Sequence, residues 1–212
     1  DTLRAHLISG TEISAIQMGL VGDGETDDHD KLNEILTSGI QVRFPAKTYK
    51  ILGAVSTVSN MVIDFNNATI LAPNSAAIIL GLTADKSVSN VTIKNAIFKG
   101  RNGIEIYPFA KNICIDHCVF ESDNEDVPMS KAITLYGADR VNITNCKIGS
   151  ETKVNYGIYM ASGENSSGSR GNTTINIDDC TIKTLMADIA QNTTETDRDI
   201  VISNCTLGGS TI

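Results

Sequence analysis

The chain has 212 residues, of which 41% are hydrophobic, and it carries a formal net charge of −8. This size and hydrophobic content predict one domain with a continuous core. The acidic excess makes the chain a poor candidate for binding nucleic acid or an anionic membrane, and no apolar run is long enough to span a bilayer. The five cysteines include no Cys-x-x-Cys pair and indicate neither a zinc site nor a disulfide framework, so we expect no metal and no cofactor.

Residues 1–18 are interpreted as a leader or neck, because their few apolar residues follow no clear period. The chain begins at Asp1, without a Met and without the pattern of a signal peptide. We therefore expect an excised or processed piece of a longer protein.

Residues 19–58 are predicted to form a cap. Gly22 and Gly24 favour a tight turn, after which Thr26 or Asp27 is expected to cap a short helix. The apolar stripe of that helix is Leu32, Ile35 and Leu36, and the helix should end before Gly39. Two strands, 41–44 and 48–52, are expected to follow. A helix with one apolar stripe is what would close the open end of a solenoid.

Residues 59–212 contain an internal repeat, whose clearest copy runs from Arg140 to Ile148. Further copies begin at Asn90, Asn112, Thr174 and Asp199, and a degenerate copy spans 61–70. Apolar and polar residues alternate in each copy, which predicts strands rather than helices. Strands recurring in the same chain direction at such intervals predict an all-β fold, a solenoid of stacked parallel strands.

Two columns of the repeat are expected to stack. The first holds residues that tolerate the left-handed conformation at a bend, namely Asn95, His117, Asn145, Asp179 and Asn204. The second holds small residues that point inward just after the bend, namely Ala96, Cys118, Cys146, Cys180 and Cys205. Four of the five cysteines are therefore interpreted as small buried apolar residues.

The cap resembles a known entry module. Gly22-Asp23-Gly24-Glu25-Thr26-Asp27-Asp28, the predicted helix, and then the segment 42–51 resemble the first part of the pectate-lyase-like, single-stranded right-handed β-helix family. Lys47 stands where that family usually has Gly, which should change only a turn. The resemblance implies a right-handed parallel β-helix with a short N-terminal capping helix.

The same family includes polysaccharide lyases, glycoside hydrolases and bacteriophage tailspikes and appendages, which are usually trimeric. A leader that runs directly into the module, with no signal peptide, resembles the phage branch. More loosely, residues 1–30 resemble pre-neck appendages of short-tailed phages of Gram-positive bacteria, which adsorb to and degrade wall teichoic acid. This resemblance implies a homotrimer in contact with other virion tail proteins, located in the virion tail or outside the cell.

A second strand in each turn exposes one lateral face. If Ile78, Ile104, Ile133, Ile158 and Ile189 point inward, one outward column is Ile79, Glu105, Thr134, Tyr159 and Ala190. The next outward column is then Gly81, Tyr107, Tyr136, Ala161 and Asn192. Tyr107, Tyr136 and Tyr159 beside a carboxylate suit sugar binding, since rings stack on the apolar faces of sugars. The alternative is that these tyrosines pack under loops or across a trimer interface.

Catalytic candidates are carboxylates, because hydrolysis of a glycosidic bond needs a pair of them. Glu105 could pair with one of four residues in a following acidic segment, namely Glu121, Asp123, Glu125 and Asp126. The alternative is that this segment is a solvated acidic loop, and it lacks the spacing and Gly of a calcium loop. In this family a lyase would need a base, commonly Arg or Lys, and a cation-rich cleft. No outward column gathers several Arg or Lys residues, so a hydrolase is favoured over a lyase.

Other titratable residues are given structural roles. Asp116 and Asp178 are expected to be solvated or ion-paired, His117 is expected to be a turn residue, and His29 to lie exposed on the capping helix.

The sequence thus predicts a phage tailspike or appendage that binds and degrades a host cell-surface glycopolymer, either capsular polysaccharide or wall teichoic acid. A non-catalytic structural or receptor-binding shaft is the alternative. The third possibility is a secreted pectin-type polysaccharide lyase or hydrolase.

Overall fold

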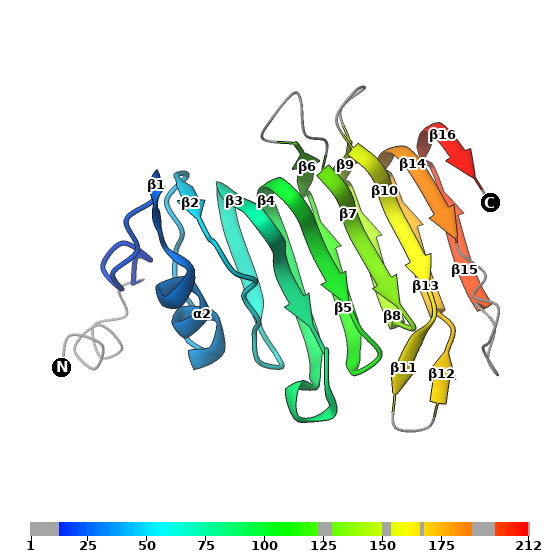
Figure 1. Cartoon of the computed structure of the whole chain (residues 1–212), viewed down its shortest axis with the longest axis horizontal. Helices are drawn as coiled ribbons and strands as arrows, with labels where there is room; N and C mark the ends of the chain where they lie inside the picture. Colours follow the sequence, from blue (N-terminus) through cyan, green and yellow to red (C-terminus); the bar gives the residue numbers. More distant parts are fainter. Residues whose placement is uncertain (1–12, 123–128, 150–153, 166–167, 188–197, 212) are drawn as a thin grey trace.

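The fold is a coil of parallel strands that stack one behind another from the N-terminal to the C-terminal end (Figure 1). The computed structural model describes residues 13–122, 129–149, 154–165, 168–187 and 198–211. Each turn of the coil is called a rung here. The prediction of a stacked parallel solenoid is confirmed, since all the pairings of the main sheet are parallel and successive copies of the repeat lie in register.

The repeat strands form the first ladder. It comprises the first part of β3 (Val62–Leu80), the first part of β4 (Val88–Ile106), β5 (Ala110–Asp116), β8 (Asp139–Thr144), β13 (Thr173–Asp178) and β15 (Arg198–Ser203). Their inward positions stack as Ile63, Ile93, Ile115, Ile143, Ile177 and Ile202. The alternation in the sequence therefore correctly identified the inward residues of this ladder, which are buried except for Ile202 in the last described rung, at 39% exposed.

The second ladder follows the bend. It comprises β1 (Asp23–Asp27), β2 (Thr48–Lys50), the middle of β3 and β4, β6 (Val119–Glu121), β9 (Lys147–Ile148), β14 (Thr181–Ala187) and β16 (Thr206–Thr211). A small antiparallel ribbon of β11 (Gly163–Asn165) and β12 (Gly168–Arg170) extends away from the coil (Figure 1).

The lateral ladder comprises the ends of β3 and β4 with β7 (Met129–Tyr136), β10 (Val154–Ala161) and the end of β14. Ile78, Ile104, Ile133 and Ile158 stack as predicted. The prediction for the next rung is wrong, because Ile158 pairs with Leu185 and Tyr159 with Met186. In that rung Met186 is in register with Tyr159, and the predicted column members Ala190 and Asn192 lie outside the described residues.

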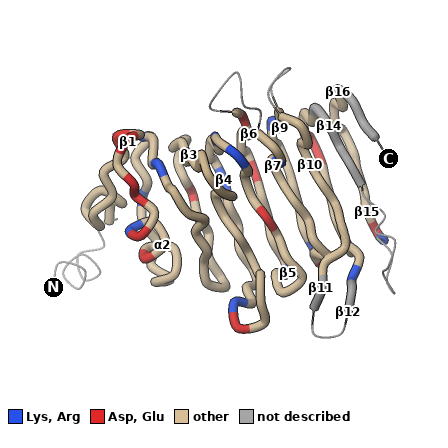
Figure 2. Tube along the Cα trace, viewed as in Figure 1, with Lys and Arg blue, Asp and Glu red and all other residues tan. Residues whose placement is uncertain are grey.

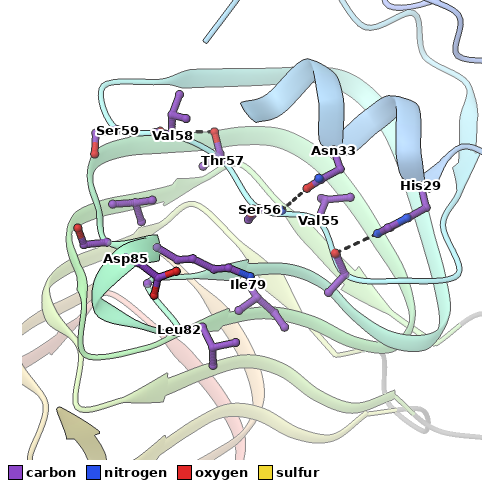
Figure 3. Close-up of a pocket in the computed structure, with 15 residues that line it drawn as sticks. His29, Asn33, Val55, Ser56, Thr57, Val58, Ser59, Ile79, Leu82 and Asp85 are labelled. Atoms are coloured by element: carbon purple, nitrogen blue, oxygen red, sulfur yellow. Dashed lines mark hydrogen bonds between the residues drawn. The ribbon is translucent and has the colours of Figure 1, made fainter. Parts of the chain in front are cut away.

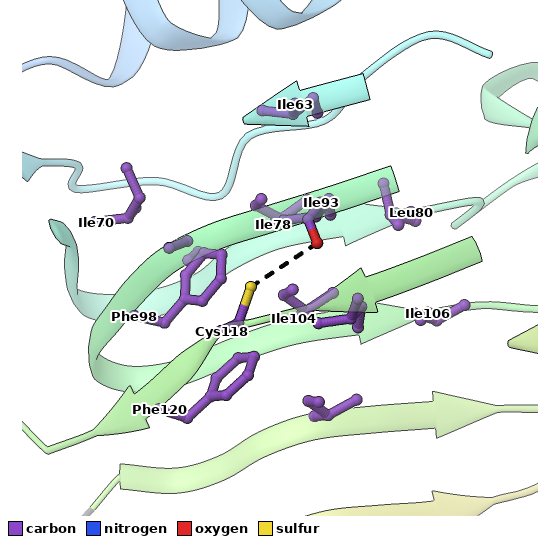
Figure 4. Close-up of a cluster of buried hydrophobic side chains, with 14 of the residues drawn as sticks. Ile63, Ile70, Ile78, Leu80, Ile93, Phe98, Ile104, Ile106, Cys118 and Phe120 are labelled. Atoms are coloured by element: carbon purple, nitrogen blue, oxygen red, sulfur yellow. Dashed lines mark hydrogen bonds between the residues drawn. The ribbon is translucent and has the colours of Figure 1, made fainter. Parts of the chain in front are cut away.

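The core runs along the coil axis as a stack of like side chains (Figure 4). Phe44, Phe65, Phe98 and Phe120 follow one another with ring centroids 4.8, 6.2 and 5.0 Å apart. The predicted column of small residues is confirmed for Cys118, Cys146 and Cys180, which are at most 2% exposed, whereas Cys205 in the last described rung is only partly buried. The Cys118 thiol donates to the carbonyl of Ile93 in the preceding rung over 3.8 Å. These cysteines therefore act as small apolar residues with a weak hydrogen bond.

The predicted column of left-handed residues is also confirmed. Asn95, His117, Asn145, Asp179 and Asn204 have φ between 49° and 53°. The structure shows a second such column, which the sequence analysis missed, at the start of each repeat: Asn90, Asn112, Arg140, Thr174 and Asp199, with φ between 54° and 57°. Each repeat strand thus lies between two left-handed bends, most of which carry Asn or Asp, the residues that tolerate this conformation best, while His117, Arg140 and Thr174 occupy the others.

Asp116 is partly exposed and lies within ion-pair distance of His117, and it is also hydrogen-bonded to the next rung. It accepts bonds from the Thr144 hydroxyl at 2.7 Å and the Asn145 amide at 2.9 Å in the next rung, and it lies 2.8 Å from His117 Nδ1. Asp178 repeats this arrangement with Ser203 and Asn204. These carboxylates tie successive rungs together, which gives both of them a structural role.

The capping helix α2 (His29–Ser38) buries Leu32, Ile35 and Leu36 and ends at Gly39, as predicted. The N-cap position is Asp28, one residue later than predicted, and its side chain makes no capping bond; the predicted Asp27 does contribute, because its carboxylate accepts the backbone N–H of His29 at 3.1 Å. The Asp28 carboxylate is buried and accepts bonds from the backbone N–H groups of Val21 and Gly22.

The residues around α2 differ from expectation in four more respects. The segment predicted as a turn contains β1, and the expected strand 41–44 makes only an isolated bridge between Ser14 and Arg43. Part of the expected leader packs on the fold, since Ala15 is fully buried. His29 is only partly exposed, with its ring against the carbonyl of Ala54. Acidic residues gather around β1 and α2 (Figure 2).

Among the described residues, no helix is long and apolar enough to cross a membrane. One short 3₁₀ helix, η1 (Ala84–Lys86), lies in the loop between β3 and β4.

Candidate functional site

The candidate site is a surface on the lateral ladder, formed where each strand bends. Gly103, Ala132 and Gly157 occupy the bend in three successive rungs and are buried. A Cβ atom at Gly103 would lie 2.3 Å from the carbonyl oxygen of Ala132, so only glycine fits there. Because of the bend, residues three positions apart in one strand lie on the same side and contact one another.

We call this surface the tyrosine face. Its first column is Asn102, Lys131 and Tyr156, its second is Glu105, Thr134 and Tyr159, and Tyr107 and Tyr136 follow beside it. The columns run along the coil axis, so neighbouring residues of a column are one strand spacing, roughly 4.8 Å, apart.

Glu105 is held by its own strand. Its Oε1 accepts a hydrogen bond from the side-chain amide of Asn102 at 3.1 Å, and its Oε2 accepts one from the Tyr107 hydroxyl at 3.1 Å. Burial, followed by the negative charge of Glu105, raises the pKa of Tyr107 well above its ordinary value. Tyr107 therefore stays a hydrogen-bond donor at any physiological pH, and both oxygens of the carboxylate have fixed positions.

Lys131 links the tyrosines of two rungs. Its ammonium group donates to the Tyr136 hydroxyl at 3.2 Å and lies 4.3 Å from the ring centroid of Tyr159. A cation over an aromatic face is stabilised by the ring quadrupole. The face therefore combines one fixed carboxylate and one fixed cation with aromatic rings.

The rings cover successive rungs. The centroids of Tyr107 and Tyr136 are 4.9 Å apart, and those of Tyr136 and Tyr159 are 6.4 Å apart, with Tyr156 at 5.8 Å from Tyr159. All four rings are partly exposed. Such a surface offers apolar ring faces with hydroxyl, carboxylate and ammonium groups at their edges, which is the composition that sugar binding requires.

Two buried polar atoms lie in this face. Within the described residues, Thr134 Oγ1 and Asn102 Oδ1 are inaccessible and have no hydrogen-bond partner. Thr134 is 1% exposed, although it was expected in an outward column, and it is in register with Glu105 on one side and Tyr159 on the other.

The predicted catalytic residues are not all brought together. Glu121 is in register with Lys99 on the second ladder and forms an ion pair with it at 3.6 Å. The positions in register with Glu105 are Ile79 and Thr134. Asp123, Glu125 and Asp126 lie outside the described residues. Of the five carboxylates, Glu105 alone is therefore placed on the tyrosine face by the described structure.

The sequence analysis missed Asn102, Lys131 and Tyr156. A strict two-residue alternation places them off the face, because each lies three positions before a residue of the second column. The signal that could have revealed them is the small residue that follows each one: Gly103, Ala132 or Gly157.

Solved structures with similar folds include a surface adhesin of Streptococcus pneumoniae, PfbA. Two structures of PfbA match with TM-scores of 0.71 and 0.72 at 16% and 17% identity. Each match covers 92% of this chain but only 61% and 57% of the adhesin, so the chain spans about three fifths of its length. A glycosyl hydrolase candidate from Parabacteroides merdae matches with a TM-score of 0.52 at 13% identity, covering 93% of this chain and 96% of that one. At these identities the likeness concerns the fold alone.

Among curated protein sequences, none matches the chain significantly. The family model described as "Right handed beta helix region" matches residues 53–211, which is most of the chain. The repeat strands from β3 onward lie within this segment, whereas β1 and β2 of the second ladder precede it. The chain therefore belongs to the right-handed β-helix family.

Proposed function

We propose that the tyrosine face binds a bacterial cell-surface glycopolymer and that Glu105 takes part in its hydrolysis. The observation that carries the proposal is the run of Tyr107, Tyr136 and Tyr159 over three successive rungs, beside a carboxylate held at both oxygens. A polymer with repeating sugar rings matches a surface with repeating aromatic rings, because each ring offers an apolar face for stacking.

In this proposal the chain forms part of a trimeric phage tail appendage, located in the virion and acting outside the host cell. The support is the sequence resemblance of the capping module, Gly22 to Asp28 with the helix and segment that follow, to the entry module of the pectate-lyase-like β-helix family. The β-helix also occurs in a bacterial surface adhesin and in a glycosyl hydrolase candidate, so the fold is compatible with either binding or hydrolysis.

Hydrolysis requires a second carboxylate at about 5.5 Å for retention of configuration, or roughly 6.5–9.5 Å for inversion. The residues proposed for this role are Asp123, Glu125 and Asp126, which follow β6 in the sequence. Glu121 is a poorer choice because it lies on the second ladder, in register with Lys99 and away from the tyrosine face.

The test begins with the solution mass by light scattering and incubation with purified wall teichoic acid and capsular polysaccharides, with product size as the readout. Calorimetry with the same polymers measures binding independently of cleavage. A trimer that binds and shortens one of them supports the proposal. A trimer that neither binds nor shortens any of them indicates a structural shaft, and a monomer that acts on pectin overturns the phage assignment.

Variants separate binding from hydrolysis. Glu105→Gln should lower the rate of cleavage by about 10²- to 10⁴-fold while the chain still binds polymer. Glu121→Gln is the matched control, since Glu121 lies off the tyrosine face. Tyr136→Ala should weaken binding about tenfold, which corresponds to about 1.4 kcal/mol. Equal activity of Glu105→Gln and the unsubstituted chain would show that Glu105 is not catalytic.

A further inference from the structure

A cavity of about 580 Å³ lies at the N-terminal end of the same lateral face (Figure 3). Its wall on the side of the cap is formed by His29 and Asn33 of α2 and by the segment 54–59. Its opposite wall is the loop that contains η1. The volume is within the range of sites that bind small molecules, about 300–1,000 Å³.

The cavity adjoins the tyrosine face through backbone register. Ile79 and Gly81 line the cavity. Ile79 is in register with Glu105, and the backbone N–H of Tyr107 donates to the carbonyl of Leu80 at 2.9 Å. From the rung of Ile79 to the rung of Tyr159 there are three strand spacings, or about 14 Å along the axis. The cavity and the tyrosines therefore lie on one line parallel to the coil axis.

Side chains fix the wall of this cavity in place. Asn33 Oδ1 accepts a hydrogen bond from the backbone N–H of Ser56 at 3.0 Å, and His29 Nε2 lies 3.2 Å from the Ala54 carbonyl (Figure 3). The Thr57 hydroxyl donates to the carbonyl of Leu36 at 3.0 Å. The segment 54–57 makes only one isolated strand bridge, at Val55. These contacts with α2 therefore hold the wall in shape before any ligand arrives.

The lining of the cavity is apolar on one side and polar at its edges. Val55, Val58, Ile79 and Leu82 provide the apolar surface. Hydroxyl, amide and charged groups from five further residues surround it: Asn33, Ser56, Ser59, Asp85 and Lys86. A sugar ring has apolar C–H faces and a rim of hydroxyl groups, so this lining is complementary to it.

We propose that this cavity is a further sugar subsite, which holds the unit of the glycopolymer next to those bound by the tyrosine face. The inference rests on the proposed function, because it extends the same bound chain toward α2. It also gives a role in binding to His29 and Asn33, whose contacts shape the cavity wall. Neither residue takes part in the proposed hydrolysis.

The test uses a tryptophan as a local reporter, since the chain has no Trp. Leu82 lines the cavity and is 41% exposed, so Leu82→Trp places an indole at its edge without disturbing the core. Leu52→Trp is the matched control, because Leu52 is 45% exposed and does not line the cavity. The probes are purified wall teichoic acid and capsular polysaccharides, and calorimetry on the unsubstituted chain first identifies the one that binds.

We expect that polymer to change the fluorescence of Leu82→Trp, with the dissociation constant given by calorimetry, and to leave Leu52→Trp unchanged. Loss of polymer binding in Leu82→Trp alone would also support the subsite, because the indole would then block it. Unchanged emission and unchanged affinity in Leu82→Trp would overturn the subsite and leave the proposed function standing. Failure of the unsubstituted chain to bind any of the polymers would overturn both.

Discussion

The Tyr107 hydroxyl donates a 3.1 Å hydrogen bond to Oε2 of Glu105, two residues earlier in the same strand. The two side chains lie on the same side of the strand, and the Asn102 amide holds the other carboxylate oxygen at 3.1 Å. A carboxylate on an exposed face is thus fixed in one orientation by its own strand. This arrangement distinguishes Glu105 from Glu121, whose described partner is the ammonium group of Lys99.

Tyr107→Phe should release Oε2 of Glu105 and keep the ring. We expect the free energy of unfolding to fall by about 0.5–1.5 kcal/mol, the usual net contribution of such a hydrogen bond. Denaturant unfolding measures this change. If Glu105 is catalytic, the same variant should lower the cleavage rate more than the affinity. An equal loss of rate and affinity would show that the hydroxyl only contributes to binding.

Lys131→Met removes the ammonium group but keeps much of the length of the side chain. The variant therefore tests the contribution of the cation while the aromatic rings stay in the face. Loss of the contact with the Tyr159 ring and of the bond to the Tyr136 hydroxyl should reduce polymer affinity. We expect a loss of about 0.5–2 kcal/mol, as measured by calorimetry. The control is Lys99→Met, which removes a cation from the second ladder. Equal losses in both variants would indicate general electrostatic attraction instead of a defined site.

The Asp116 ladder predicts a loss of stability in acid. Partial burial opposes ionisation of Asp116, but hydrogen bonds from Asn145 and Thr144 and the pairing with His117 outweigh it and lower its pKa below the ordinary 3.8. The unfolded chain therefore binds this proton at a higher pH than the folded chain. The stabilisation is present above pH 3.8 and decreases as the pH falls through the folded pKa.

Asp116→Asn removes that titration, so its free energy of unfolding should vary less steeply below pH 3.8 than that of the unsubstituted chain. Denaturant unfolding at several acidic pH values gives the comparison. The control is Asp199→Asn, at an exposed left-handed position that Asn suits equally well. Identical pH profiles of Asp116→Asn and the unsubstituted chain would contradict the role of the ladder.

The cysteine column predicts selective thiol chemistry. Cys118, Cys146 and Cys180 are buried, whereas Cys114 and Cys205 are partly exposed. A hydrogen bond with Cys118, together with burial, raises the pKa of Cys146 and disfavours its reactive thiolate. A water-soluble disulfide reagent should therefore label only Cys114 and Cys205 in the folded chain and all five thiols after unfolding. Cys114→Ser and Cys205→Ser identify the two reactive groups, and rapid labelling of Cys146 would show that the column opens.

Much of the fold could be predicted from sequence because its determinants are local. Alternation within a repeat sets which residues face inward, and a left-handed bend selects Asn, Asp or His at one position of each turn. The column from Asn95 to Asn204, the small residues after it and the apolar stripe of α2 all follow from such rules. The resemblance of the capping module then pointed to a right-handed coil, which the family match confirms.

The composition of the site was decided by tertiary structure. The number of residues between the bend and the lateral strand differs between rungs: Ile158 follows Cys146 by twelve residues, but Leu185 follows Cys180 by five. A sequence pattern alone favoured Ile189, whereas the stacking of strands on the preceding rung selects Leu185. Likewise, the backbone bends at Ala132, and this bend breaks the alternation of inward and outward residues on which the prediction relied. Lys131 therefore lies on the tyrosine face. Repetition in the sequence specifies what each rung contains, but the register between rungs depends on loop lengths and on packing against neighbouring strands.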